Sequence, residues 1–270
     1  MKVLISVDME GISGVVRVDH TMSDHKEYDR FRKLMTLEAN AAIEGALAGG
    51  ATSVVVNDSH GGMANILVED LNPAAELISG SPKPFSMVQG IGPDVNVVFF
   101  IGYHSQMGTG ASVLSHTYHG GVVAELRLNG QAVGETGLNA AVAGAYGVPV
   151  VLVTGDSAVT EEARALLGNI ETVAVKEGTS WTSARCLHPE VARKRIREAA
   201  ERAVKSKPAP FVLPTPITVR VTFQRPGHAD MASLIPGTRR LDGVTLEYVA
   251  PDVLTAYNAF RAMFVLASAL

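Results

Sequence analysis

Two carboxylates, Asp8 and Glu10, follow the apolar run 3–7 near the start of the chain. The run is short and β-branched, which predicts a buried strand. In extended chain a spacing of two residues puts both carboxylates on one face, and Gly11 and Gly14 then let the backbone turn away. Two such anions repel each other unless one is protonated or a cation lies between them. The pattern indicates a metal site, although helix capping would use the same residue types.

Two histidines follow later strands in the same way. The segments 52–56 and 95–101 are predicted strands, and they lead into His60 and His104. Because ligands gather at the carboxyl ends of parallel strands, we expect both imidazoles to converge on the two carboxylates. Imidazole nitrogen and carboxylate oxygen without thiolate suit zinc, and also manganese or iron.

The elements that must position these groups alternate between strand and helix. Apolar spacing predicts a helix over 28–47, and 148–153 is a further buried strand. The fold class is therefore α/β, with a mostly parallel sheet flanked by helices in three layers. We predict an α/β metal-binding catalytic domain over 1–207 and a small C-terminal α+β domain over 208–270. A hairpin near 120–134, which turns at Asn-Gly, is a candidate to complete the smaller domain.

Other polar residues carry weaker signals. Glu135 lies at a strand-to-helix junction, where favouring the helix N-terminus and ligating a metal are equally good explanations. Asp156 ends a strand, and capping explains it at least as well as a site. His20 and His25 are expected to be solvated in a loop that borders a site or a neighbouring subunit. His228 is expected to be structural or peripheral.

The composition excludes several classes of function. The 270 residues are 47% hydrophobic and 19% charged, with a formal net charge of −4 and no basic run, which argues against nucleic-acid binding. No apolar run approaches the length of a membrane span, and acidic residues interrupt any signal-peptide pattern. No phosphate-binding glycine motif occurs, and the single cysteine, Cys186, excludes an internal disulfide framework. We predict a cytoplasmic protein.

The residues also carry a resemblance that runs in the same order through essentially the whole chain. The segments that carry it are SVDMEGISG (6–14), VNDSH (56–60), KPFSMV (83–88), GYH (102–104), Ser115-His116, VGE (133–135) and GLN (137–139). In these segments the chain resembles the zinc-dependent D-aminopeptidase family of the bacterial dipeptide-operon type.

The resemblance implies two zinc ions per chain. Asp8 matches the carboxylate that bridges both metals, and Glu10 and His60 complete one side of the site. The other side is completed by the metal ligands His104 and Glu135, and His116 matches the catalytic histidine. The charge count agrees independently, because two zinc ions bring four positive charges, three carboxylates remove three, and a bridging hydroxide removes the last.

The resemblance further implies an aminopeptidase that hydrolyses the N-terminal residue of short peptides or amides through a zinc-activated water. D-amino-acid peptides, D-alanine peptides among them, are the implied substrates. A homodecamer of two pentameric rings is implied as well, and its inner chamber would admit only short peptides. The chain departs from the family pattern in the 20–25 loop and at His228, where the family has an amide side chain.

Two alternatives remain on the pattern alone. A two-metal phosphoesterase would use comparable ligands, although it would usually add asparagine and further histidines around a phosphate. A non-catalytic, metal-dependent peptide-binding protein would also need this site, and it would bind peptide without turnover.

Overall fold

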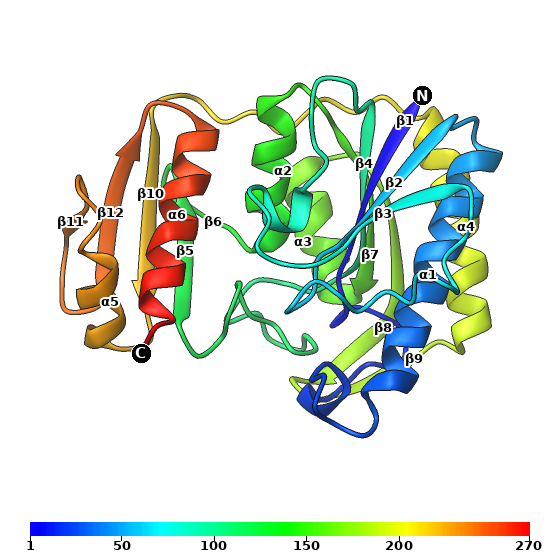
Figure 1. Cartoon of the computed structure of the whole chain (residues 1–270), viewed down its shortest axis with the longest axis horizontal. Helices are drawn as coiled ribbons and strands as arrows, with labels where there is room; N and C mark the ends of the chain where they lie inside the picture. Colours follow the sequence, from blue (N-terminus) through cyan, green and yellow to red (C-terminus); the bar gives the residue numbers. More distant parts are fainter.

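The computed structural model describes all of residues 1–270, and its larger sheet occupies one half of the molecule (Figure 1). The seven strands of this sheet are β1 (Lys2–Val7), β2 (Ser53–Asp58), β3 (Ala75–Ile78), β4 (Val97–Tyr103), β7 (Val150–Asp156), β8 (Glu171–Ser180) and β9 (Ser183–Cys186). Their spatial order is β3-β2-β1-β4-β7-β8-β9. All neighbours pair in parallel except β8 and β9, which form an antiparallel hairpin.

Helices cover both faces of this sheet. On one face lie α1 (Tyr28–Ala48) and α4 (Pro189–Lys205), and on the other α2 (Glu135–Ala145) and α3 (Ser157–Leu167) (Figure 1). Side chains alternate along β1, so Val3, Ile5 and Val7 pack with α1 and α4, whereas Leu4 packs toward α2. The predicted three-layer α/β/α arrangement is confirmed. Short 3-10 turns at Val18–His20 and Ser86–Val88 lie in the connections.

The smaller sheet is antiparallel and lies beside α2. It has the order β11-β12-β10-β5-β6 and is built from β5 (Val123–Leu128), β6 (Gln131–Ala132), β10 (Ile217–Phe223), β11 (Arg239–Arg240) and β12 (Thr245–Ala250). The helices α5 (Pro226–Ala232) and α6 (Val253–Ala267) pack on it, and α6 also contacts α2. The β5–β6 hairpin thus pairs with the C-terminal strands through β10. The division of the chain at 207 and 208 stays a prediction.

The strands β8 and β9 are not among the strands that the sequence predicts, because their exposed, polar tip lacks an apolar pattern. The charged helix α4 buries one face, since Ile196 and four alanines lie against the core shared with α1. None of the helices combines the length and apolar character that crossing a membrane requires.

The order in which successive strands are added to the sheet reverses between β1 and β4. Strands β2 and β3 extend from one side of β1, whereas β4, β7 and β8 extend from the other. At the carboxyl ends of β1 and β4 the backbones approach closely, with Gly11 N–H donating to Gly102 O at 2.7 Å. Gly102 has φ +71°, and a Cβ atom there would lie 2.3 Å from Asp8 O. The close approach therefore requires glycine, and it brings the residues that follow both strands together.

Candidate metal centre

Five predicted ligands meet at the carboxyl edge of the larger sheet. Asp8 and Glu10 follow β1, His60 follows β2, His104 follows β4 directly, and Glu135 is the first residue of α2. The three carboxylates and His104 are buried, and the His60 side chain is 12% exposed. The meeting point lies where the strand order reverses, which is the usual ligand position in open α/β sheets.

Asp8 stands between two groups of residues. Its Oδ1 lies 3.3 Å from His60 Nδ1, and its Oδ2 lies 3.4 Å from His104 Nε2. Beyond these, His60 Nδ1 is 2.9 Å from Glu10 Oε2, and His104 Nε2 is 3.3 Å from Glu135 Oε2. Each oxygen of the central carboxylate therefore faces a different histidine, and each histidine faces a second carboxylate.

Backbone carbonyls fix which nitrogen of each ring faces the carboxylates. His60 Nε2 lies 2.9 Å from Thr21 O, and His104 Nδ1 lies 3.0 Å from Ser105 O. A carbonyl only accepts, so these nitrogens carry hydrogen. In the neutral rings the lone pairs of His60 Nδ1 and His104 Nε2 then point at carboxylate oxygens. A proton or a metal ion must lie between such facing acceptors.

The buried polar atoms fit a zinc site. Asp8 Oδ2, Glu10 Oε2 and His104 Nε2 are buried and make no hydrogen bond. Two ligands of a tetrahedral zinc, each about 2.1 Å from the ion, lie roughly 3.4 Å apart. Three of the four acceptor pairs lie 3.3–3.4 Å apart. Two imidazoles and three carboxylates are also a donor set that zinc accepts.

The electrostatics of the centre follow from burying three carboxylates together. Burial, and then the charge of Glu10, raise the pKa of Asp8 to about 7. Burial would raise the pKa of Glu10 too, but His60 holds it well below its usual value. Burial likewise opposes charging of His104, yet Glu135 and Asp8 raise its pKa well above the ordinary value. Protons and a metal ion therefore compete for the same positions.

Buried polar groups hold the loop that carries His60. The Asp58 carboxylate accepts hydrogen bonds from the backbone N–H groups of Asn65 at 2.5 Å and Ile66 at 2.7 Å. Lys83 is buried beside it and donates to Asp58 O at 2.5 Å and Asn57 Oδ1 at 2.7 Å. The end of β2 is thus fixed from both sides, and the position of His60 with it.

His116 lies against the second group of residues. Its ring stacks on His104 with centroids 4.0 Å apart, and its Nε2 lies 3.8 Å from Glu135 Oε1. Its Nδ1 lies 2.8 Å from Leu114 O, so Nδ1 carries hydrogen and Nε2 faces the centre. Burial, and then the charge of His104, lower the pKa of His116. The ligand atoms of His104, His116 and Glu135 lie within 4.8 Å of one another, which is also close enough to share a metal.

The loop that carries His116 is unusual in its backbone. Three non-glycine residues in it, Ala111, Leu114 and Tyr118, have φ of 49°, 53° and 61°. Such conformations persist only where surrounding contacts enforce them, and they gather at functional sites. One contact is made by Glu135, whose Oε1 accepts the Tyr118 N–H at 2.7 Å. A predicted ligand thus also holds the loop.

Asp156 and Trp181 provide further anchors for this loop. Asp156 Oδ2 accepts from Val113 N–H at 2.7 Å and from the Ser112 hydroxyl at 2.9 Å. Its Oδ1 accepts from Val159 N–H at 2.9 Å and so caps α3 as well. Trp181, which is half-exposed at the β8–β9 tip, donates from its indole to Ser115 O at 3.3 Å. Sequence analysis missed Trp181, because nothing in the pattern links 181 to 115.

The remaining histidines lie outside the centre. The expectation that His20 is solvated is wrong, because it is buried and its ring stacks on Phe31 at 3.8 Å. It helps to fix the loop before Thr21, whose carbonyl contacts His60, since His20 Nδ1 accepts the Val16 N–H. His228 is buried in α5, away from the ligands.

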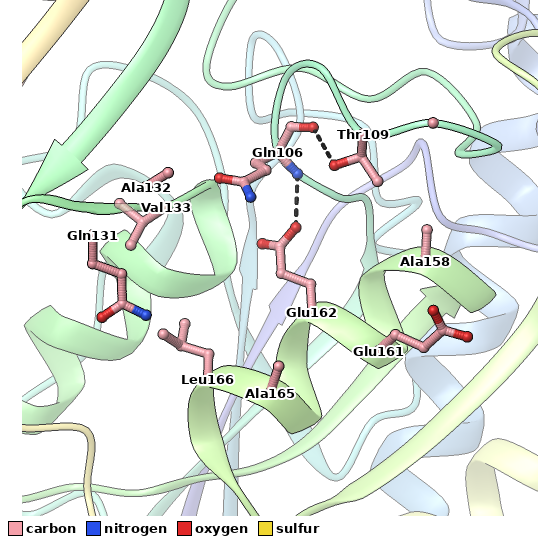
Figure 2. A pocket seen from close by; sticks show the side chains of 11 residues that line it. Gln106, Thr109, Gln131, Ala132, Val133, Ala158, Glu161, Glu162, Ala165 and Leu166 are labelled. Atoms are coloured by element: carbon pink, nitrogen blue, oxygen red, sulfur yellow. Dashed lines mark hydrogen bonds between the residues drawn. The ribbon is translucent and has the colours of Figure 1, made fainter.

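A pocket of about 400 Å³ opens beside the loop that follows His104, between α3 and β6 (Figure 2). In it, Glu162 accepts a hydrogen bond from Gln106 N–H at 2.9 Å. None of the predicted ligands lines this pocket. Its polar contact ties the loop after β4 to α3, and the pocket is distinct from the centre.

Comparisons with known proteins agree on one family. Residues 1–262 match the model of the peptidase M55 family, described as D-aminopeptidase. The chain is 42% identical to a D-aminopeptidase from Bacillus subtilis (strain 168), over 99% of this chain and 98% of that protein. It also resembles the solved structure of the Zn-dependent D-aminopeptidase DppA from Bacillus subtilis, described as a self-compartmentalizing protease. That match has a TM-score of 0.97 and 41% identity, and it covers 100% of this chain and 99% of the other.

The two roles of Asp156 generate a prediction about stability. Asp252 is a matched control, because its carboxylate caps α6 by accepting from Thr255 N–H at 2.8 Å and holds no loop. Asp252→Ala should cost about 1 kcal/mol of unfolding free energy, the usual value for an N-cap. Asp156→Ala should cost about 2–4 kcal/mol, since it also leaves buried loop donors without a partner. Urea unfolding followed by circular dichroism measures both.

The fluorescence of Trp181, the single tryptophan, reports on the loop in the same samples. It should shift in folded Asp156→Ala and stay unchanged in Asp252→Ala. Equal stability losses with an unchanged emission spectrum would show that Asp156 is only a helix cap.

Proposed function

The chain belongs to the peptidase M55 family of D-aminopeptidases and is a hydrolase, and from this premise we propose that it removes N-terminal D-amino acids from short peptides with two zinc ions. The solved relative is described as Zn-dependent, which supports the choice of metal. The observation that carries the proposal is the position of Asp8. Its two oxygens face two different histidines, as a carboxylate shared by two metal ions requires.

We assign the ligands accordingly. Asp8 bridges, Glu10 and His60 complete one zinc site, and His104 and Glu135 complete the other. The short acceptor-to-acceptor distances within each group support this division. When bound, a zinc pair lowers the pKa of a water molecule and polarises the carbonyl of the scissile bond.

His116 is proposed as the catalytic residue. Its Nδ1–H is engaged by Leu114 O, and its lowered pKa favours the neutral ring, so Nε2 presents a lone pair toward the centre. This arrangement supports proton transfer: Nε2 accepts a proton during attack and gives it to the leaving amine. A neutral ring in this tautomer has no hydrogen on Nε2 with which to stabilise an oxyanion, so we favour proton transfer over that role.

The distances also permit a competing role for His116 as a third ligand with His104 and Glu135. The two roles differ in what the side chain does for zinc. A ligand holds the ion, so its removal releases metal. A proton carrier leaves the metal in place and affects only turnover.

The substrate class is proposed from the family and from the chemistry of the site. Short peptides with N-terminal D-alanine are the proposed substrates, and the free α-amino group would meet either a metal or an acidic side chain of the centre. A phosphoesterase is less favoured, because the ligand groups include no asparagine and no further histidine beyond His60, His104 and His116. A peptide-binding protein without turnover would not need His116 to be held in position as a proton carrier.

We propose that the chain acts as a homodecamer of two pentameric rings. The solved relative is described as self-compartmentalizing, which supports a closed assembly. Several large apolar side chains of the C-terminal residues are exposed in the single chain, among them Val212, Leu234, Val249 and Val265. Light scattering coupled to gel filtration should give ten times the mass of one chain, and the mass of a monomer or dimer would reject the ring.

The activity itself is tested with zinc-loaded protein and two dipeptides, D-Ala-D-Ala and L-Ala-L-Ala. We expect release of D-alanine from the first and much slower cleavage of the second, with loss of turnover after chelation. His116→Ala should lower kcat about 10²–10⁴-fold, the range of general acid–base catalysis. Its bound zinc, measured by mass spectrometry of metals, should stay at two ions per chain.

His25 is partly exposed and lies outside both ligand groups, so His25→Ala is the matched control, and it should keep both zinc and turnover. Loss of zinc in His116→Ala would make His116 a ligand instead of a proton carrier. Two bound zinc ions with no cleavage of either dipeptide would keep the metal assignment and reject the substrate class.

A further inference from the structure

Lys176 lies inside the larger domain, directly behind the turn that carries Glu10. It belongs to β8, and it is 2% exposed. Its Nζ donates to three backbone carbonyls of one turn, those of Glu10, Ile12 at 3.0 Å and Val15 at 2.5 Å. An ammonium group has three donors, so its hydrogen-bonding capacity is used entirely on this turn. No carboxylate lies within ion-pair distance of it.

A buried carboxyl group from α1 holds the same turn. Glu38 of α1 is 1% exposed, and its Oε1 accepts the Ser13 N–H at 2.8 Å. The Ser13 hydroxyl also donates to Leu187 O at 2.8 Å. A lysine thus takes the carbonyls of the turn, and a glutamate takes one of its amides. The turn contacts β8, α1 and the segment after β9, three elements far apart in the sequence.

The turn has little support of its own. Its internal hydrogen bonds are Ile12 N–H to Met9 O and Val15 N–H to Ile12 O, both 3.1 Å. Of the three carbonyls that face Lys176, only that of Ile12 has such a partner, and those of Glu10 and Val15 accept from no backbone N–H. They lie inside the protein, where unpaired acceptors are costly. An apolar side chain in β8 would avoid the cost of burying an ammonium, but it would leave these carbonyls unpaired. The buried ammonium of Lys176 therefore serves the carbonyls of the turn, and not the packing of the core.

The turn matters because Glu10 is part of it. The carbonyl that Lys176 contacts belongs to the residue whose carboxylate lies 2.9 Å from His60 Nδ1. Fixing the peptide at Glu10 fixes the direction in which its side chain leaves the backbone. Groups that orient a metal ligand from behind typically contribute 10–100-fold to metal affinity.

We propose that Lys176 is a positioning residue for Glu10, which it holds, together with Glu38, in the orientation that binds one of the two zinc ions. The inference rests on the proposed function, because it takes Glu10 as a ligand. It adds a residue from β8 to a centre whose ligands come from β1, β2, β4 and α2. It also explains why a lysine is buried in a strand that contributes no ligand.

The test compares Lys176→Met and Lys176→Gln with the wild type by zinc competition against a chromogenic chelator. We expect Lys176→Met to weaken one zinc site about 10–100-fold and to leave the other within a factor of about two. Lys176→Gln keeps a donor amide and should give a smaller loss at the same site. Ile217→Val, a substitution of a fully buried residue in β10 of the smaller sheet, is the control for general destabilisation, and both its zinc affinities should be unchanged.

Melting temperatures of the zinc-free proteins show whether a loss of stability alone explains a loss of zinc affinity. Unchanged zinc affinities in folded Lys176→Met, or an equal loss in Ile217→Val, would overturn the inference. If neither Lys176 variant folds with zinc present, Lys176 is a folding residue and the positioning role is rejected. A wild type that binds fewer than two zinc ions would instead reject the proposed function, and this is seen before any variant is compared.

Discussion

Three carboxylates buried at one sheet edge are the constraint on which the rest of the structure depends. Asp8, Glu10 and Glu135 are each at most 5% exposed, and like charges in such a place repel strongly. Three histidines, His60, His104 and His116, lie within 4 Å of these carboxylates, and no lysine or arginine does. Bound cations would balance the remaining charge, and we propose that they bind at the buried acceptor atoms that have no hydrogen-bond partner. A two-zinc centre satisfies both requirements.

Backbone groups provide most of the contacts that orient the side chains of the centre. The carbonyls of Thr21, Ser105 and Leu114 orient the three histidine rings, and each comes from a loop that is itself held by buried polar groups. Two buried lysines act from behind the strand ends, Lys83 at the end of β2 and Lys176 at the turn after β1. Both have their pKa lowered to about 8 by burial, yet their hydrogen bonds go to oxygens of the chain. Rigid positioning of this kind is what a metal centre needs before it is loaded.

The sequence predicted the fold class and the meeting of the ligands because both depend on local patterns. Short β-branched runs that end in acidic residues or histidine indicate parallel strands with a site at their carboxyl ends, and Asp8, His60 and His104 obey that rule. Lys176 and Trp181 could not be found this way, since neither contact is local in the sequence. Lys176 of β8 contacts Glu10, 166 positions earlier, and Trp181 at the β8–β9 tip contacts Ser115, 66 positions earlier. The expectation for His20 failed because stacking on Phe31 is a tertiary contact with no periodic signal.

The most direct test of the account is anomalous diffraction at the zinc edge from crystals of the zinc-loaded protein. A carboxylate shared by two metals predicts two peaks, about 3.5–4 Å apart, on either side of Asp8. One peak should contact Glu10 and His60, and the other His104 and Glu135, with His116 outside both coordination spheres. A single peak, or a second peak that is bound by His116 and not by Asp8, would contradict the bridging role on which the account rests.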